Sequence, residues 1–254
     1  MGKIIALANQ KGGVGKTTTA VNLTAALGQR KKRCLLVDLD QQANATSGFG
    51  IEKPDIGSSS YELIMGSRPA EELILPTQCE NVWIIPSCME LAGAEIELVS
   101  ASNRELKLKY RLAALRDRYD YIIIDTQPSL GLLPLNALSA ADTVLVPIQC
   151  EFYALEGLSQ LTNTIARVKR AYNPMLEIEG VLMTMYDSRL NLTQEVAAQV
   201  KKYFPRQVFK TTIPRTVRLA EASSYGQPMT IFDKRNQGAV AYDNLAKELI
   251  KRNR

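Results

Sequence analysis

Residues 3–18 have the sequence KIIALANQKGGVGKTT, in which an apolar run leads into a glycine-rich turn and then into residues that favour a helix. The glycines let the backbone pass close to an anion, because they carry no side chain that would keep it away. The amides of such a turn, and those at the start of the following helix, point toward a bound phosphate. The segment therefore predicts a phosphate-binding loop between a strand and a helix. Its expected contacts are Lys11, Gly12, Gly13, Val14, Gly15, Lys16, Thr17 and Thr18.

Two lysines stand in this loop. Lys16 is placed to contact the β- and γ-phosphates of a nucleotide, and the neighbouring Thr17 hydroxyl is suited to ligate Mg²⁺. Gln10 occupies the position where a phosphate-binding loop usually has its first glycine, and Lys11 follows it directly. Since Lys16 already serves the phosphates of its own pocket, Lys11 is left either for a second site or as a solvated residue at the edge of the loop.

Two further apolar runs end in carboxylates. Residues 35–40 read Leu-Leu-Val-Asp-Leu-Asp, and residues 121–125 read Tyr-Ile-Ile-Ile-Asp. A carboxylate at a strand end can hold Mg²⁺ through water or orient the water that attacks a phosphate, although aspartates also cap turns there. Together with the loop, the two runs predict an active site for phosphate hydrolysis. In it, Asp125 binds Mg²⁺ through water, and Asp40 positions the attacking water and contributes to the metal site. Asp38 is expected to face the other side of its strand.

The composition is that of an ordinary globular protein, and it excludes several kinds of chemistry. The 254 residues are 46% apolar and 22% charged, and no linker divides them, so we expect one domain over residues 1–254. The chain has no histidine, which excludes a His-based triad and a zinc site with His ligands. Its four cysteines are far apart, which favours reduced core residues in a cytoplasmic protein over disulfides. No apolar run reaches the roughly 18 residues that would indicate a membrane span.

Apolar runs alternate with segments of helical periodicity along nearly the whole chain. This alternation predicts an α/β fold, with a single doubly wound, mostly parallel sheet and helices on both of its faces. The expected strands are residues 3–8, 33–39, 82–86, 121–125, 143–148, 178–185 and 207–210. The expected helices are residues 17–29, 90–99, 104–118, 155–172, 192–203, 216–223 and 238–251. Residues 41–60 lack clear periodicity and follow the second strand, so we expect a mobile loop there at the ligand-binding edge of the sheet.

Positive charge is concentrated toward the carboxyl terminus. Residues 186–254 carry 13 Lys and Arg against 6 Asp and Glu, whereas residues 1–185 carry 18 against 20. Such asymmetry attracts a polyanion, either nucleic acid or an anionic membrane surface, unless these residues only form a solvated helical face. The basic residues are spread over several expected helices with few aromatic residues among them. This pattern favours contact with the backbone of duplex DNA over stacking on single strands.

Seven short motifs make the sequence resemble the ParA/Soj family of partition ATPases. They are residues 11–18 (KGGVGKTT), 37–40 (VDLD), 44–47 (NATS), 91–98 (LAGAEIEL), 125–131 (DTQPSLG), 151–157 (EFYALEG) and 213–222 (IPRTVRLAEA). The resemblance implies a deviant Walker A ATPase that uses ATP and Mg²⁺, with Lys11 reaching across an ATP-dependent homodimer to the partner's nucleotide. It also implies that the dimer binds double-stranded DNA without sequence preference and that a ParB/Spo0J-type protein stimulates hydrolysis. The implied location is cytoplasmic and nucleoid-associated.

The family pattern also assigns roles to single residues. Arg189 and Arg218 match positions of DNA contacts, and Pro214 matches a loop beside the adenine. The chain departs from the pattern at Gln41 and Gln127, where the family commonly has proline. Both glutamines border the expected phosphate site, but neither is a charged catalytic group, so we expect the chemistry to persist. The full set of expected DNA contacts is Arg189, Arg218, Lys201, Lys202, Arg215 and Lys247.

Three other functions are compatible with the same loop. A membrane-associated ATPase of the MinD type needs a carboxy-terminal helix that lies in a bilayer. Residues 239–254 instead have apolar residues at core-packing intervals and no bulky aromatic anchor at the end, so no stable membrane insertion is expected. A ligase or an iron–sulfur protein on this fold would leave the basic carboxy-terminal quarter unexplained, and Cys88 and Cys150 lack the glycine-rich surroundings of cluster ligands. Lys11 and Asp40 disfavour a scaffold that binds ATP without hydrolysing it.

Overall fold

A seven-stranded sheet forms the centre of the protein. The computed structural model describes residues 2–52, 57–129 and 131–253. The strand order is β3-β4-β2-β5-β1-β6-β7, and all neighbours are parallel except β3 and β4. The strands are β1 Lys3–Leu7, β2 Cys34–Leu39, β3 Leu75–Pro76, β4 Val82–Ile85, β5 Tyr121–Thr126, β6 Thr143–Gln149 and β7 Glu177–Thr184. Because β5 lies between β1 and β2, the predicted loop and the aspartates of both runs leave the sheet at adjacent strand ends.

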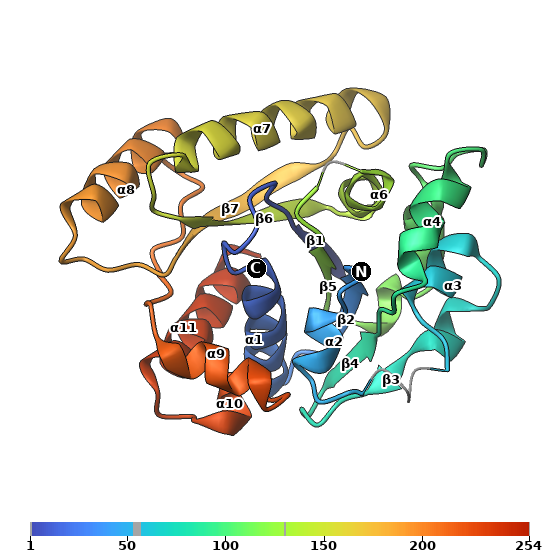
Figure 1. Cartoon of the computed structure of the whole chain (residues 1–254), viewed down its shortest axis with the longest axis horizontal. Coiled ribbons are helices and arrows are strands. Elements are labelled where there is room, and N and C mark those ends of the chain that lie inside the picture. Colours follow the sequence, from blue (N-terminus) through green and yellow to red (C-terminus); the bar gives the residue numbers. More distant parts are fainter. Residues whose placement is uncertain (1, 53–56, 130, 254) are drawn as a thin grey trace.

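Helices cover both faces of this sheet, as Figure 1 shows. They are α1 Lys16–Gln29, α2 Asn44–Ser47, α3 Ser60–Met65, α4 Leu91–Leu98, α5 Lys107–Ala113, α6 Leu132–Ala140, α7 Ala154–Ala171, α8 Asn191–Tyr203, α9 Val217–Ser224, α10 Met229–Phe232 and α11 Gln237–Arg252. Successive side chains of β1 point to opposite faces. Ile4 packs with helices α3 to α8, whereas Ile5 packs with α1, α2 and α9 to α11. The doubly wound α/β fold is therefore confirmed.

The last helix, α11, packs along α1, the helix that follows the phosphate loop (Figure 1). Tyr242, Leu245 and Leu249 of α11 are buried, and the Tyr242 hydroxyl lies 3.2 Å from that of Thr19 in α1. The apolar face of α11 is thus used in the core, as its spacing predicts. Within the residues that the structure describes, no helix combines the length and apolar character needed to cross a membrane.

Residues 207–210 are not a strand, so that prediction is wrong. The segment runs beside β7 but forms only one bridge, between Val208 and Val181. Two of its carbonyls are taken up by the Arg252 guanidinium, which donates to Gln207 at 3.3 Å and to Val208 at 2.8 Å. In β7, the segment exchanges backbone hydrogen bonds with Val181 alone, at 3.0 Å each, and the Arg252 side chain of α11 supplies further donors to its carbonyls.

Several helix predictions also need correction. The helix expected over residues 104–118 is limited to α5, followed by a 3₁₀ turn at Arg116–Arg118. The apolar periodicity does not reveal α6, because nearly all of its residues are buried and no polar face is left. It also misses α3, whose start is marked by a capping box between Ser59 and Glu62. Residues 53–56 of the loop expected over residues 41–60 lie outside the described residues, and α2 occupies part of the remainder.

Candidate active site

The glycine-rich turn joins β1 to α1 and has the backbone that its sequence predicts. Gly13 and Gly15 have φ angles of 73° and 83°, in the left-handed region that side chains rarely adopt. Lys16, the first residue of α1, is only 6% exposed, and its Nζ donates a hydrogen bond to the Lys11 carbonyl at 3.3 Å. Burial lowers the pKa of Lys16, while the charges of Asp125 and Asp40 act to raise it. The lysine is therefore held inside the loop, facing carboxylates.

Side-chain hydrogen bonds to two neighbouring strands hold this loop in place. Asn9 accepts a hydrogen bond from the Lys11 amide at 3.0 Å and donates one to the Pro147 carbonyl in β6 at 2.7 Å. Thr184, the last residue of β7, donates through its hydroxyl to the Val14 carbonyl of the loop, with an oxygen separation of 2.7 Å. The loop is thus tied to both β6 and β7, which keeps its amides in one arrangement.

Asp125 lies beside the loop, at the centre of the site. It pairs in register with Leu7 of β1 on one side and with Asp38 of β2 on the other. Its side chain is fully buried, and neither carboxylate oxygen has a well-formed hydrogen bond among the described residues, although the Thr17 hydroxyl is close enough to lower its pKa. Burial, followed by the nearby charge of Asp38, raises the pKa of Asp125 to about 8. A buried carboxyl whose oxygens lack well-formed hydrogen bonds is costly for stability, which is typical of a residue kept for its chemistry.

Asp38 is part of this group, contrary to the expectation that it faces the other side of its strand. Residues two apart share a face of a strand, so Asp38 and Asp40 leave β2 on the same side. Asp38 accepts hydrogen bonds from the Asp40 amide at 3.1 Å, the Thr46 amide at 2.9 Å and the Thr46 hydroxyl at 2.7 Å. The same hydroxyl accepts from the Ser87 amide at 2.9 Å. Burial raises the pKa of Asp38 to about 6, against the lowering effect of these bonds.

Asp40 is held at the edge of the cavity. It is 7% exposed, and its carboxylate accepts a hydrogen bond from the Gln42 amide at 3.0 Å. The cavity has a volume of about 740 Å³, and its lining also includes Lys16, Thr17, Gln41 and Gln127. Through Asp38, the end of β2 thus fixes the backbone that presents Asp40 to the phosphate site.

The donor set of the cavity fits Mg²⁺. Mg²⁺ prefers oxygen ligands and usually keeps several waters, so it needs only one or two protein groups in addition to phosphate oxygens. Thr17 offers a hydroxyl in the cavity lining, and Asp125, which is buried close to Thr17 and Lys16, offers carboxylate oxygens. The described residues contain no group of three or more His, Cys, Asp or Glu placed as ligands of a single ion. The site therefore matches an ion shared with a nucleotide better than a metal held by the protein alone.

Lys11 forms an ion pair with Glu151, a residue to which the sequence motifs assign no role. Glu151 lies two residues beyond the end of β6, and the Lys11 and Glu151 side chains are 40% and 43% exposed. Lys11 thus points away from its own cavity and along the surface. The position of Glu151 in the 151–157 motif marked it as a residue of interest. Its pairing with Lys11, 140 residues away in the sequence, is visible only in the folded chain.

A smaller cavity adjoins the phosphate site. Its volume is about 250 Å³, and it shares Gly15, Thr18 and Met185 with the larger cavity. Pro214 lines it, next to the backbone bridge between Pro214 and Tyr186. Pro214 thus stands beside a mostly separate compartment that opens onto the phosphate loop.

The expected DNA contacts do not form a single cluster. Arg189 follows the carboxyl end of β7, and Arg215 lines the smaller cavity. Lys247, by contrast, lines a groove with Glu177 and Glu179 at the amino end of β7. Lys201 and Lys202 lie in the last turn of α8, and Arg218 lies in α9. The expected contacts are therefore spread over α8, α9, α11 and the loops that hold Arg189 and Arg215. Figure 1 shows these three helices on one side of the molecule.

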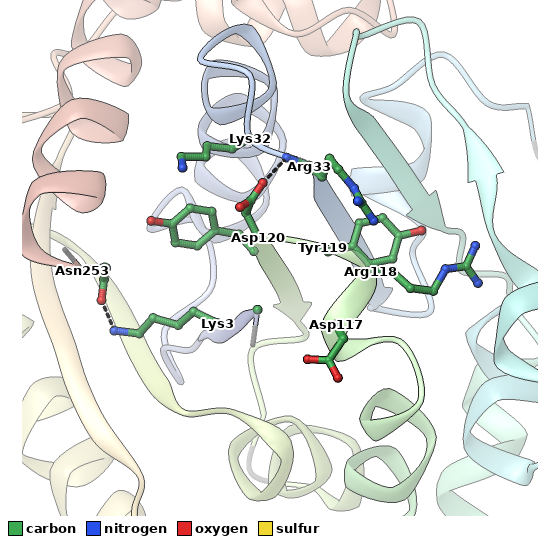
Figure 2. Close-up of a pocket in the computed structure, with 10 residues that line it drawn as sticks. Lys3, Lys32, Arg33, Asp117, Arg118, Tyr119, Asp120 and Asn253 are labelled. Carbon is green, nitrogen blue, oxygen red and sulfur yellow. Dashed lines mark hydrogen bonds between the residues drawn. The ribbon is translucent and has the colours of Figure 1, made fainter.

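A different polar cavity, of about 520 Å³, opens at the amino ends of the strands (Figure 2). Figure 2 shows Lys3 bonded to Asn253, and Lys3 also pairs with Glu179 at 2.6 Å. Asp120 accepts the Arg33 amide at 2.7 Å. Much of the charge in this cavity is thus met from within the fold, and the phosphate loop is on the opposite edge of the sheet. The carboxyl edge remains the candidate active site.

Known proteins resemble this chain over nearly its full length. A family profile for an AAA domain matches residues 2–178. The chain is 56% identical over 249 residues to the sporulation initiation inhibitor protein Soj of Bacillus subtilis strain 168, covering 98% of each chain. It is 52% identical over 252 residues to the chromosome partitioning protein ParA of Myxococcus xanthus, covering 99% of this chain and 89% of that protein.

Solved structures extend the agreement to the fold. The structure of a Mycobacterium smegmatis protein named cobyrinic acid a,c-diamide synthase, with bound ADP and magnesium, has a TM-score of 0.87 and 37% identity to this chain. The match covers 99% of this chain and 95% of that one. The identities to Soj and ParA are higher, and both relatives are matched over nearly their full length. The chain therefore belongs to the ParA/Soj family of chromosome-partitioning ATPases.

Proposed function

We propose that this ATPase hydrolyses ATP in a dimer that binds DNA, and that hydrolysis releases the DNA and resets the cycle. The observation that carries the proposal is that Lys16 and Asp40 line one cavity with the glycine-rich loop, while Asp125 is buried close enough to act on both by charge. If the glycine-rich segment were only a tight turn between β1 and α1, it would not require the two carboxylates. Asp40 and Asp125 are supplied by the ends of two other strands, β2 and β5.

In the proposed reaction, the loop amides and Lys16 bind the phosphates of ATP. Lys16 exchanges the Lys11 carbonyl for phosphate oxygens. Asp40 accepts a hydrogen bond from the attacking water and directs its oxygen toward the γ-phosphorus. As the new P–O bond forms, the bond from the γ-phosphorus to the bridging oxygen breaks, and ADP leaves with that electron pair. The proton of the water passes to Asp40 or to the released phosphate.

Thr17 and Asp125 are the residues that would hold Mg²⁺, with Asp125 acting through water. When bound, the ion neutralises charge on the phosphates. Asp125 must ionise for this role. The positive charge of a bound ion would favour its ionised form, which burial disfavours in the free protein.

Lys11 is proposed to act on the nucleotide of the partner subunit. Its ion pair with Glu151 is half-exposed, so it can be exchanged for another anion without unfolding the loop. Phe152 and Tyr153 follow Glu151 and are 75% and 66% exposed. Exposed aromatic side chains next to a catalytic loop are suited to burial in a subunit interface. In the dimer, Lys11 would neutralise charge that develops on the phosphoryl group.

Double-stranded DNA is the proposed partner of the basic surface. Arg189, Arg218, Lys201, Lys202, Arg215 and Lys247 are its proposed contacts. Two copies of this surface in one dimer turn a weak contact into a strong bivalent one, so binding should depend on ATP and fall steeply with salt. A ParB/Spo0J-type protein is the proposed activator of hydrolysis, and the proposed location is cytoplasmic, on the nucleoid.

A MinD-like function at a membrane is the alternative. It would require an amphipathic carboxy-terminal helix free to lie in a bilayer. The apolar face of α11 is instead packed on α1, including the fully buried Leu245 and Leu249. This packing favours DNA over a lipid surface.

Gel filtration of wild type and Asp40→Ala tests the proposal. The variant with ATP and Mg²⁺ should elute as a dimer, because it binds ATP without cutting it, and should move to larger size with a nonspecific DNA duplex. With ADP it should elute as a monomer, and Lys16→Ala should stay monomeric with either nucleotide. Monomeric Asp40→Ala protein in ATP would contradict the role of the nucleotide in joining two chains.

A further inference from the structure

Some basic residues of the carboxy-terminal quarter already form ion pairs with neighbouring carboxylates, and others do not. Lys201, Lys202 and Arg215 form no ion pair with the described residues. Arg189 does form one, although its side chain is 86% exposed. Its guanidinium donates to both carboxylate oxygens of Asp187, at 2.9 Å and 2.7 Å, and its amide donates to the same carboxylate at 3.0 Å. Asp187 therefore occupies the Nε–Nη2 edge of the guanidinium, and a phosphate that binds this edge has to displace it.

Asp187 is well placed to compete with a phosphate. It presents two oxygens to the planar guanidinium, which is the arrangement that a phosphate diester also offers. The pKa of Asp187 is lowered to about 2 by hydrogen bonds from the Arg189 side chain and amide, so the carboxylate is charged at physiological pH. Its side chain is 23% exposed, less than that of Arg189, so the carboxylate is the more fixed member of the pair.

The same segment begins at the nucleotide site. Thr184 donates its hydroxyl to the Val14 carbonyl of the phosphate loop. Met185 lines both the larger and the smaller cavity, and it has a φ of 48°. A non-glycine residue with this φ is uncommon and is kept there only by its surroundings. Tyr186 then donates its amide to the Ile213 carbonyl at 2.9 Å. A short stretch of chain thus connects the loop-bound Thr184 to Arg189.

From this geometry we propose that Asp187 acts as a latch: its carboxylate holds the Arg189 guanidinium in an ion pair, and nucleotide bound against Met185 breaks that pair. Without ATP, the carboxylate holds the guanidinium and weakens its contact with DNA. A ligand in the two cavities contacts Met185 and shifts the residues that follow it, which separates Asp187 from Arg189. The inference rests on the proposed DNA binding and adds a means by which the nucleotide state controls it.

DNA binding by Asp187→Asn tests the latch. Asparagine removes the charge but keeps an oxygen that can accept the Arg189 amide, so the turn is preserved. Glu195→Gln is the matched control, because Glu195 is an exposed carboxylate of α8 that forms no ion pair with the described residues. Fluorescence anisotropy of a labelled nonspecific duplex is measured for each protein at low salt, with ADP and with a nonhydrolysable ATP analogue and Mg²⁺.

With ADP, Asp187→Asn should bind DNA about three- to fivefold more tightly than wild type, the range open to one exposed ion pair. With the ATP analogue, the gain should fall below about twofold, because the latch is already open. Glu195→Gln should change neither value by more than about twofold. Adding Arg189→Ala to Asp187→Asn should remove the gain, because the effect passes through that arginine.

Three results would overturn the latch: no gain beyond that of Glu195→Gln, an equal gain in both nucleotide states, or weaker binding by Asp187→Asn. Unchanged ATP affinity and thermal unfolding of the variant confirm that it is folded. A failure of the proposed function looks different, since wild type itself would then show no ATP-dependent DNA binding.

Discussion

Replacing the buried Asp125 with asparagine should remove a loss of stability that the nucleotide-free protein otherwise shows as pH rises. Burial and Asp38 raise the pKa of Asp125 to about 8 in the folded chain, from an ordinary value of 3.8. Between these pH values the folded state keeps a proton that the unfolded state has released. Stability is therefore full below the lower value and is lost as pH rises toward the higher one.

The size of the effect follows from this difference. Each pH unit over which the folded state holds one more proton than the unfolded state costs about 1.4 kcal/mol. Because the raised pKa values of Asp38 and Asp125 are coupled, the two carboxyls share a loss of a few kcal/mol between pH 5 and 8. The asparagine side chain would not titrate, but its amide would leave a buried donor unpaired, at about 1–3 kcal/mol. The variant should thus be less stable than wild type by about 1–3 kcal/mol near pH 5 and more stable by a similar amount near pH 8.

Urea unfolding in EDTA, followed by the fluorescence of the single tryptophan, Trp83, measures this at each pH. Glu195→Gln again serves as the control, since it removes an exposed negative charge and should leave the pH profile parallel to that of wild type. If Asp125→Asn also gives a parallel profile, or is less stable than wild type at pH 8, then Asp125 does not carry the raised pKa and the reasoning fails.

Two further substitutions test other contacts of the site. Thr46→Val removes the hydroxyl that donates to Asp38 and leaves the buried Ser87 amide without its acceptor, so we expect urea unfolding to show a loss of about 2–4 kcal/mol in stability and phosphate release to be slower. Thr46→Ser keeps a hydroxyl and should recover most of the stability and of the rate. Equal behaviour of the two variants would show that the hydroxyl does not contribute. Lys11→Ala should bind a fluorescent ATP analogue as tightly as wild type. Its turnover should fall by at least about 100-fold, because the variant lacks a charge that stabilises the phosphoryl group during hydrolysis. Unchanged turnover would show that Lys11 only pairs with Glu151.

The phosphate loop was predictable because its chemistry is local. Gly13 and Gly15 need left-handed backbone angles, and Lys16 must begin a helix, so a few consecutive residues carry the whole signal. The aspartates at strand ends were predictable for a similar reason, since parallel strands deliver their carboxyl ends to one edge. The doubly wound sheet follows from the alternation of buried runs with amphipathic helices such as α7 and α11.

Other features could not be inferred from spacing. Residues 207–210 resemble a strand, but they form a single bridge to β7, and Arg252 from the far end of the chain donates to two of their carbonyls. Helix α6 is buried on nearly all sides, which removes the periodicity by which helices are detected. The role of Asp38 depends on Thr46 and Ser87, which belong to a short helix and to the loop after another strand.

Consecutive residues are thus enough to define the class of this protein: glycines, a lysine and a threonine after a strand specify a phosphate loop, and an alternating pattern specifies the layers. The state of the site depends on packing between segments that are distant along the chain. Folding buries Asp38 and Asp125 side by side and raises their pKa values, and it pairs Lys11 with Glu151. The physical reason is that backbone geometry is governed by near neighbours, whereas desolvation and charge interactions are governed by whatever the fold places within a few ångströms.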